Sequence, residues 1–389
     1  MIYSEFQGKK LSALGFGAMR LPKHEDGTID EQAVAEQVRY AIDHGVNYFD
    51  TAYFYHSGES ESVMGRVLKA YPRDSYYLAS KYPGHQVDPK TANPAEIFED
   101  QLRKCQVEYF DFYLLHNVNE MSLEAYLDPK WGIVEYLKEQ KRLGRIRHLG
   151  FSTHAAMPCL KRFLEVWGED MEFCQIQLNW LDWTLQDAKG KYELLTERGI
   201  PVWTMESIRG GRLAKLSEDQ EAALKCRRPN ESAASWGFRY LQSLPNVKMI
   251  LSGMTRMEDL KDNIRTFSEG EPLRSEEIAL LMELAEQMKD SLPCTACRYC
   301  CDGCPQGLDI PMLLEAYNEL RFALSPVVRG RLDLLPAEQR PEACIGCGKC
   351  EAHCPQGIAI RDELKSAQKV LEPPLMKAAQ KFIGWFMRF

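Results

Sequence analysis

The sequence predicts an α/β protein in which a parallel (β/α)8 barrel, also called a TIM barrel, is followed by a smaller, mainly helical domain. Two observations lead to this prediction. Short apolar segments alternate with helical patterns through about the first 290 residues, and nine of the thirteen cysteines then fall between residues 294 and 354. A chain of 389 residues that is 45% hydrophobic is long enough to bury one large core and a second small one.

Eight strand candidates occur in the barrel region, each a short apolar segment that ends in polar residues. They are LSALGFG, NYFD, YYLASK, FDFYLLH, RHLGFS, FCQIQLN, PVWTME and KMILSG. Helical patterns lie between them, as at residues 30–44, 93–107 and 133–142, and several begin at Asp, Asn or Pro. Repeated strand and helix units favour a closed barrel whose active site lies at the carboxyl ends of the strands.

The sequence divides into three parts. Residues 1–290 form the predicted barrel, residues 291–370 a cysteine-rich domain, and residues 371–389 an amphipathic C-terminal tail. The first 14 residues are expected to form a hairpin that turns at Gly8 and closes the bottom of the barrel.

Charge and hydropathy limit the choice of partners. The formal net charge is −8 and no concentrated basic stripe offsets it, so we expect no nucleic acid partner. No apolar run approaches membrane-spanning length, and the N-terminus MIYSEFQGKK lacks the apolar stretch of a signal peptide. We therefore expect a cytoplasmic protein.

Eight of the cysteines repeat one pattern, C-x2-C-x2-C-x3-C-P. The two runs are Cys294, Cys297, Cys300 and Cys304, followed by Pro305, and Cys344, Cys347, Cys350 and Cys354, followed by Pro355. Two intervening residues let the backbone curl around a metal cluster, and the proline stops the chain from continuing as a regular helix. The pattern resembles that of a bacterial two-cluster ferredoxin, and it predicts two 4Fe-4S clusters in which the fourth thiolate of each run reaches the other cluster.

Zinc and disulfide bonds are the alternatives for these cysteines. Zinc favours two separated C-x2-C pairs, and disulfides need an oxidising compartment, so two clusters are the favoured interpretation. In the first run, Cys301 stands beside Cys300 and is an alternative third ligand, although only Cys300 reproduces the spacing of the second run. Buried or bystander thiols are the default interpretation of the four scattered cysteines, Cys105, Cys159, Cys174 and Cys226.

The segment that begins with the second predicted strand carries a second resemblance. It reads NYFDTAYFYHSGESESVMG, which contains D-T-A-x-x-Y followed by Ser-Glu and Gly, and it resembles the aldo-keto reductase family over most of the first 290 residues. Taken residue by residue, the resemblance implies a catalytic tetrad at the ends of strands two, three and four, made of Asp50, Tyr55, Lys81 and His116. One departure is His56, which stands where the family commonly has Gly.

The chemistry of carbonyl reduction gives these four residue types a role. Hydride addition leaves an alkoxide that must receive a proton, and a tyrosine with a pKa of about 10 is a poor donor and acceptor at neutral pH. Lys81 is expected to lower the pKa of Tyr55, and Asp50 to fix Lys81 by an ion pair. His116 is expected to hydrogen-bond the carbonyl oxygen. The alternative is a structural ion pair, a loop aromatic and a core histidine, but four matches at three successive strand ends favour the tetrad.

The resemblance also implies a nicotinamide cofactor, NADH or NADPH. The positions implied to contact it are Ser152, Thr153, Gln175, Ser207, Gly211, Gly253, Arg256 and Asn263. Thr153 replaces the usual Asn, and Met205 stands where an aromatic residue usually stacks on the nicotinamide. Asp259 lies near the usual arginine position, and a carboxylate there would repel a 2'-phosphate, so NADH is at least as favoured as NADPH. A plain turn is the alternative for Gly210 and Gly211.

The two parts raise a question of electron bookkeeping. A nicotinamide gives two electrons as hydride, whereas a cluster passes one at a time, so direct coupling needs a flavin or another one-electron carrier. We expect an oxidoreductase that interconverts a small-molecule carbonyl and alcohol, with clusters that relay electrons. The alternatives are structural clusters, a ferredoxin-linked oxidoreductase with a flavin or unusual substrate in the barrel and an external ferredoxin as partner, and a non-catalytic electron carrier or assembly module.

Two segments of the C-terminal region are amphipathic. LDIPMLLEAYNELRFAL, between the cysteine runs, reads as a helix with apolar positions at Ile310, Leu313, Leu314, Tyr317, Leu320 and Leu324. The last residues, 373–389, combine aromatic and basic side chains. Docking onto the protein or a twin subunit is favoured over contact with a membrane.

Overall fold

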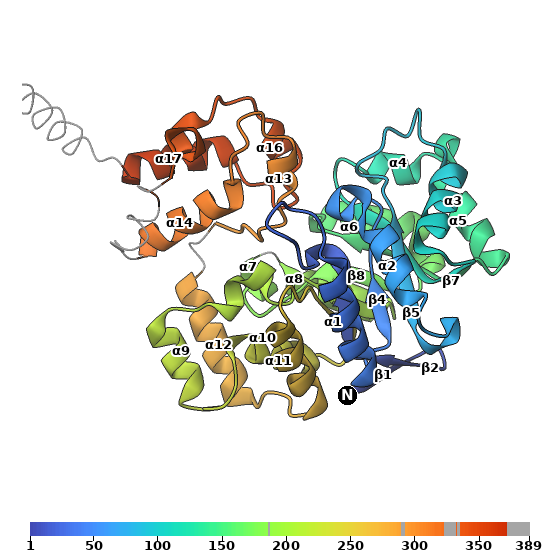
Figure 1. The fold of residues 1–389 in the computed structure, drawn as a ribbon, viewed down its shortest axis with the longest axis horizontal. Coiled ribbons are helices and arrows are strands. Elements are labelled where there is room, and N and C mark those ends of the chain that lie inside the picture. Colours follow the sequence, from blue (N-terminus) through green and yellow to red (C-terminus); the bar gives the residue numbers. More distant parts are fainter. Residues whose placement is uncertain (186, 289–291, 323–331, 333–334, 372–389) are drawn as a thin grey trace, which may run out of the picture. The chain divides into compact units, whose positions relative to one another are not determined.

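The structure is a computed structural model that describes residues 1–185, 187–288, 292–322, 332 and 335–371 (Figure 1). It divides into two compact units. Unit 1 is Met1–Glu286, and unit 2 begins at Gln287. Within the described residues, no helix is long and apolar enough to cross a membrane.

Unit 1 is a closed barrel of eight parallel strands, hydrogen-bonded in chain order from β3 to β10, with β10 returning to β3. The strands are β3 (Leu14–Gly17), β4 (Tyr48–Asp50), β5 (Tyr77–Tyr82), β6 (Phe110–Val118), β7 (Ile146–Thr153), β8 (Cys174–Gln177), β9 (Val202–Met205) and β10 (Val247–Ser252). Each overlaps one of the eight strand candidates. The predicted (β/α)8 barrel is therefore confirmed.

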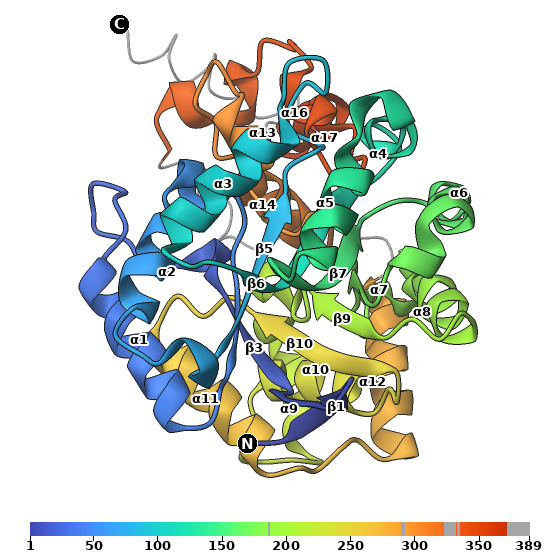
Figure 2. The same cartoon turned by 90° about the vertical axis from the view of Figure 1, so that its right-hand side faces the viewer.

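Helices surround the strands of unit 1 (Figure 2). They are α1 (Glu31–Asp43), α2 (Ser60–Leu68), α3 (Pro94–Cys105), α4 (Leu123–Leu127), α5 (Ile133–Arg142), α6 (Met157–Trp167), α7 (Asp182–Leu185), α8 (Ala188–Glu197), α9 (Glu218–Lys225), α10 (Ala233–Gln242), α11 (Met257–Ser268) and α12 (Ser275–Met288). Polar caps set the starts that the sequence indicated. The carboxylate of Asp30 accepts from the backbone of Ala33 at the start of α1, and the amide of Asn93 accepts from Ala95 at the start of α3.

A two-stranded hairpin precedes the barrel and consists of β1 (Tyr3–Phe6) and β2 (Lys9–Ser12). Its turn contains Gly8, whose φ of +77° lies in the region that glycine adopts without strain. Phe6 is buried against Phe112 and Trp203, with ring centroids 5.7 and 5.0 Å away, inside the core cluster at the amino ends of the strands. The hairpin therefore closes the bottom of the barrel, as the sequence predicted.

Unit 2 is helical in the part of the chain that the structure describes. Its helices are α13 (Tyr299–Asp302), α14 (Ile310–Phe322), α16 (Lys349–Ala352) and α17 (Ile360–Leu371), with short 3-10 turns at Ala337–Gln339 and Pro341–Ala343. α14 is the helix expected between the cysteine runs, and its Ile310, Leu313 and Leu314 are buried in the core of the unit. Leu324 lies outside the described residues, as does the predicted tail 371–389 apart from Leu371.

Candidate functional site

Three neighbouring parallel strands bring the predicted tetrad to one end of the barrel. Asp50 is the last residue of β4, while Lys81 and His116 lie in the carboxyl-terminal parts of β5 and β6. The register places Asp50 beside Ala79 and Lys81 beside Leu114, so the three polar side chains belong to the same end of the sheet. Tyr55 begins a short 3-10 turn, η2 (Tyr55–Gly58), just after β4.

Lys81 is the centre of this group. Its ammonium lies 2.5 Å from Asp50 Oδ1, donates to the carbonyl of Thr51 at 2.8 Å, and lies 3.4 Å from the hydroxyl of Tyr55. Lys81 is 0% exposed and Asp50 3%. Two opposite charges buried in this way hold each other in one geometry, because leaving either one unpaired in the protein interior is strongly unfavourable.

Burial dominates the protonation of Tyr55. It holds the pKa of Tyr55 well above the usual 10, and the carboxylates of Asp50 and Glu206 raise it further. The expectation that Lys81 would lower this pKa is therefore wrong for the structure. Asp50, at 2.5 Å from Lys81 Nζ, offsets the lysine charge, and the hydroxyl lies farther away at 3.4 Å. Tyr55 is a neutral phenol at pH 7 and can donate its proton.

His116 completes the group as a neutral imidazole. Its ring centroid lies 5.9 Å from that of Tyr55 and 4.5 Å from that of His85. Burial lowers the pKa of His116 well below 6.5, helped by His85, Lys81 and His154. Its Nδ1 is buried and has no hydrogen-bond partner within the described residues. A neutral ring in this position can offer one N–H to an oxygen bound next to Tyr55.

A second polar layer lies next to Lys81, and only one of its members, Glu61 of the Ser-Glu pair that follows Tyr55, belongs to the motif recognised in the sequence. Glu61 Oε1 accepts from Ser80 Oγ at 2.5 Å and from Gln101 Nε2 at 2.6 Å, and Gln101 Nε2 also lies 3.1 Å from the carbonyl of Lys81. All three side chains are 0% exposed. Gln101 was detectable in principle, because it is a polar residue on the face of α3 that otherwise buries apolar side chains.

His56 ties the turn that carries Tyr55 to the loop after β3. Its Nε2 accepts from the backbone N–H of Leu21 at 3.1 Å. Its φ is +52° and that of Ser57 is +56°, a left-handed conformation that Gly would adopt without strain. Burial lowers the pKa of His56 to about 4, so its ring is neutral and accepts hydrogen bonds at pH 7.

The predicted nicotinamide contacts at β7 and β8 differ in what their side chains can offer. Ser152 Oγ accepts from Asn117 N at 2.8 Å, and Thr153 Oγ1 donates to the carbonyl of Val118 at 2.6 Å. Both hydroxyls therefore bind the backbone at the carboxyl end of β6. Gln175 pairs with Ser152 in the barrel register, and its Oε1 is buried with no partner among the described residues. Gln175 is thus the one of these three with an unused acceptor.

Two of the predicted contacts after β9 and β10 join neighbouring segments to the end of β10. Ser207 Oγ donates to the carbonyl of Leu251 at 3.0 Å, and Asn263 Nδ2 donates to Ser252 Oγ at 3.0 Å. Gly211 has a φ of +99°, and a side chain on Gly253 would meet Cβ of Arg20 at 3.1 Å.

Arg256, the basic residue among the predicted cofactor contacts, is already paired. Its Nη2 lies 2.5 Å from Asp259 Oδ1 at the start of α11, and the arginine side chain is 71% exposed. This contact offsets the positive charge that a 2'-phosphate would need. Met205, at the expected stacking position, is half-buried at the end of β9.

A buried polar chain across the ends of β7, β8 and β9 was missed from the sequence. His154 Nδ1 lies 3.1 Å from Gln177 Oε1, Gln177 Nε2 donates to Asp182 Oδ2 at 2.7 Å, and Asp182 Oδ1 lies 3.2 Å from Arg209 Nη2. Asp182 is 0% and Arg209 1% exposed. No spacing in the sequence links these residues, because the barrel closure alone brings their loops together.

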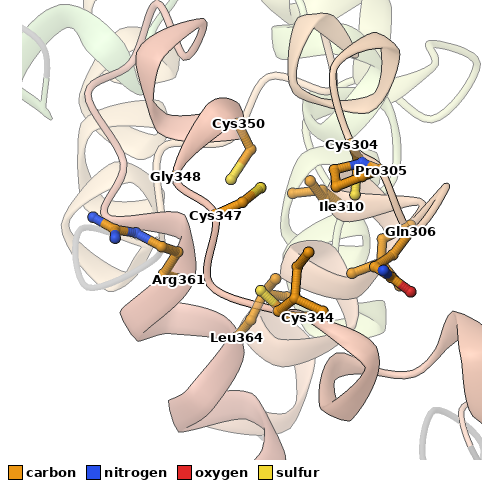
Figure 3. Close-up of a pocket in the computed structure, with 12 residues that line it drawn as sticks. Cys304, Pro305, Gln306, Ile310, Cys344, Cys347, Gly348, Cys350, Arg361 and Leu364 are labelled. Atoms are coloured by element: carbon orange, nitrogen blue, oxygen red, sulfur yellow. The ribbon is translucent and has the colours of Figure 1, made fainter.

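The eight pattern cysteines of unit 2 line two separate cavities. The space called cage 1, about 300 Å³, is bordered by Cys294, Cys297, Cys300 and Cys354. The space called cage 2, about 320 Å³, is bordered by Cys304, Cys344, Cys347 and Cys350 (Figure 3). Each cage therefore takes three thiols from one run and the fourth from the other, which is the crossed arrangement that the sequence pattern predicted.

The residues around the cages fit iron–sulfur clusters. Each cage offers four thiols, which is the number of ligands that a 4Fe-4S cluster takes. Cys300 borders cage 1 and is buried, whereas Cys301 is absent from the residues that border it. The structure therefore favours Cys300 as the third ligand.

Comparisons with known proteins agree with both units. A sequence model of the aldo/keto reductase family matches residues 13–286, and one of a 4Fe-4S dicluster domain matches residues 293–359, so both resemblances drawn from the sequence are confirmed. "Probable aldo-keto reductase 1" of Glycine max is 27% identical over 206 residues, which span 50% of this chain and 56% of that protein. L-galactose dehydrogenase of Arabidopsis thaliana is 26% identical over 293 residues, 68% of this chain and 87% of that protein.

Solved structures show the fold. An aldo-keto reductase from Klebsiella pneumoniae in complex with NADPH has a TM-score of 0.60 at 22% identity, over 73% of this chain and 96% of that one. At this identity the likeness extends to the barrel architecture alone.

Proposed function

The chain belongs to the aldo/keto reductase family and carries a 4Fe-4S dicluster domain, and we propose that its barrel interconverts a small-molecule carbonyl and alcohol by hydride transfer with NADH or NADPH. The observation that carries this proposal is the position of Lys81. Its buried ammonium contacts both Asp50 Oδ1 and the Tyr55 hydroxyl, beside the neutral ring of His116.

Each member of this group has a role in the proposed reaction. A bound nicotinamide would supply the hydride to the carbonyl carbon, and the phenol of Tyr55 would supply the proton to the oxygen. His116 donates a hydrogen bond to the same oxygen, and Lys81 stabilises the phenolate that remains after proton transfer. Asp50 keeps Lys81 in place through the 2.5 Å contact.

The nicotinamide would be held by Ser152, Thr153, Gln175 and the loops at Ser207, Gly211, Gly253, Arg256 and Asn263. The unused Oε1 of Gln175 supports this, because it is an acceptor of the kind that a carboxamide N–H needs. The Arg256–Asp259 pair supports NADH as the preferred form.

Replacement of Tyr55 by Phe tests the proposal. Loss of the proton donor is expected to lower the turnover of small aldehydes and ketones by about 10²- to 10⁴-fold. The measurement is anaerobic oxidation of NADH and NADPH across a panel of such carbonyls. Tyr53→Phe is the matched control, since Tyr53 lies two residues away with its ring against Lys104 instead of Lys81. Wild-type turnover in Tyr55→Phe would rule out Tyr55 as the donor.

The crossed thiol cages favour a second candidate, in which electrons also pass through the clusters. Two clusters together take two electrons, the number that one hydride carries, and a flavin is the class of carrier that converts between them. An external ferredoxin or similar redox protein would be the partner. Anaerobic addition of NADH or NADPH alone, with the visible absorption of the clusters recorded, tests this. Bleaching supports the relay, whereas NADH consumption with a carbonyl but without bleaching favours clusters with a structural role.

A further inference from the structure

One arginine borders each thiol cage. Arg298 is among the residues around cage 1, and Arg361 is among those around cage 2. Arg298 directly follows Cys297, and the guanidinium of Arg361 packs against the loop between Cys347 and Cys350, with its Cζ 3.6 Å from where a side chain on Gly348 would begin. Figure 3 shows Arg361 beside Gly348.

Each of these arginines is fixed by one carboxylate. Arg361 Nε and Nη2 lie 2.9 and 2.7 Å from Glu351 Oε2, and the backbone N–H of Arg361 donates to Glu351 Oε1 at 2.8 Å. Arg298 Nη1 lies 3.1 and 3.2 Å from the two oxygens of Asp309. Arg361 and Arg298 are among the residues that border the cages, whereas Glu351 and Asp309 are not. In Figure 3 the guanidinium of Arg361 points away from the cysteine sulfur atoms, so its charge acts on the cage from outside the thiols.

In the two pairs, the cation and the carboxylate come from opposite elements. At cage 1 the cation lies in the cysteine loop, and the carboxylate of Asp309 stands just before α14. At cage 2 the carboxylate of Glu351 directly follows Cys350, and the cation lies in the first turn of α17. The shared result is an arginine placed against each cage from a different element, which a sequence repeat alone would not produce.

We propose that Arg298 and Arg361 set the reduction potentials of the two clusters. Reduction would add one electron to a cluster and no proton, so it would add one negative charge near each arginine–carboxylate pair. A fixed cation stabilises that charge and raises the potential, and the paired carboxylate opposes this effect. This inference concerns the clusters themselves and does not depend on the reaction of the barrel.

A purely mechanical role makes a different prediction. If the pairs only fasten the cysteine loops to α14 and α17, loss of either partner breaks the same clamp and has the same effect. If the charges act on the cluster, loss of the cation and loss of the carboxylate have opposite effects. The sign of the shift in potential therefore separates the two roles.

The experiment is a redox titration of the full-length protein, purified without oxygen and followed by the electron paramagnetic resonance of the reduced clusters, with dithionite as the reductant. We expect Arg361→Gln to lower the potential of one cluster and Glu351→Gln to raise the potential of the same cluster. Arg298→Gln and Asp309→Asn are expected to do the same for the other. Lys365→Gln is the control, because Lys365 lies on α17 in an exposed pair with Asp362 and does not border either cage.

The proposal would be overturned if the two variants of one pair shifted the reduction potential in the same direction. Unchanged potentials at full iron content would overturn it as well. Should Arg361→Gln lose its iron, Glu351→Gln decides the matter, because it keeps Arg361 and its charge. An upward shift in that variant supports the proposal, and no shift contradicts it.

Discussion

Cys304 belongs to the first cysteine run, yet it borders the same cavity as Cys344 of the second run. Cys354 makes the reciprocal crossing into the cage of Cys294. The two runs are therefore interlocked, and neither can complete its cage alone. This makes unit 2 a single folding element with respect to its clusters, because binding of metal and folding of such small domains are coupled.

The crossing predicts which substitutions affect the same cluster. Cys304→Ala and Cys347→Ala are expected to alter the resonance of one cluster, and Cys297→Ala and Cys354→Ala that of the other, each with a loss of up to about half of the iron. Iron analysis and resonance spectra of the reduced variants measure this. Cys301→Ala should keep the full iron content and both resonances. Were Cys304→Ala to alter the same resonance as Cys297→Ala, the crossed assignment would be wrong.

The fold of both units could be predicted from the sequence, and the physical reasons can be named. Apolar runs such as FDFYLLH mark strands that are buried on both faces, and β6 is buried along its whole length. The cysteine spacing was sufficient to predict that the fourth thiol of each run borders the cage of the other run. The effect of burial could not be predicted from the sequence: the pKa of Tyr55 is raised and not lowered, because desolvation and the carboxylates of Asp50 and Glu206 all raise it.

Contacts between distant loops could not be predicted from the sequence either. Arg209 and Asp182 meet only when β8 and β9 pair in the closed barrel. Gln101 reaches Glu61 only because α3 packs beside α2. His56 was visible as a departure from the family, but its partner Leu21 was not. Local patterns predict elements, whereas these pairings depend on their assembly.

His56 is expected to stabilise the fold through its hydrogen bond with Leu21, while its left-handed backbone destabilises the fold in part. His56→Ala keeps the left-handed backbone and loses the hydrogen bond with Leu21, so we expect a loss of about 1–2 kcal/mol. His56→Gly loses the same bond but relieves the strain, so its stability should be within about 0.5 kcal/mol of wild type. Urea denaturation of both variants measures the difference. Equal losses in the two would show that strain at φ +52° is not a factor.

The same histidine predicts how stability depends on acid. The pKa of His56 is lowered to about 4 in the folded protein, from 6.5, so the unfolded chain binds a proton that the folded one does not. The contribution of His56 is complete above pH 6.5 and is lost as the pH falls towards 4. His56→Asn, which accepts a hydrogen bond without titrating, should lose less stability over that interval than wild type. Parallel curves for the two proteins would contradict this.

The Arg256–Asp259 contact predicts the response to cofactor identity. Asp259→Asn releases the guanidinium and removes a negative charge, so the preference for NADPH over NADH should rise by about tenfold, or ~1.4 kcal/mol. Arg256→Gln is the matched control and should lower that preference. The ratio of kcat/KM for the two nucleotides measures the effect, which should weaken at high salt because Arg256 is 71% exposed. An unchanged ratio in both variants would place the 2'-phosphate elsewhere.

The high pKa of Tyr55 predicts opposite pH profiles for the two directions of the proposed reaction. Carbonyl reduction needs the phenol, which persists until the pH passes a value well above 10, so its rate should show no decline from Tyr55 between about pH 6 and 9. Alcohol oxidation needs the phenolate and should still be rising at the alkaline end. Initial rates across pH provide the check. A decline in carbonyl reduction with an apparent pKa near 8, absent from Tyr55→Phe, would show that Lys81 controls the pKa of the tyrosine after all.

The buried pair of Lys81 and Asp50 predicts the effect of a neutral partner. Asp50→Asn leaves Lys81 buried without its counter-ion, so it should lose about 3–5 kcal/mol of stability and most of the turnover in both directions. Denaturation curves and initial rates of this variant measure the two losses, and wild-type stability in Asp50→Asn would contradict the prediction.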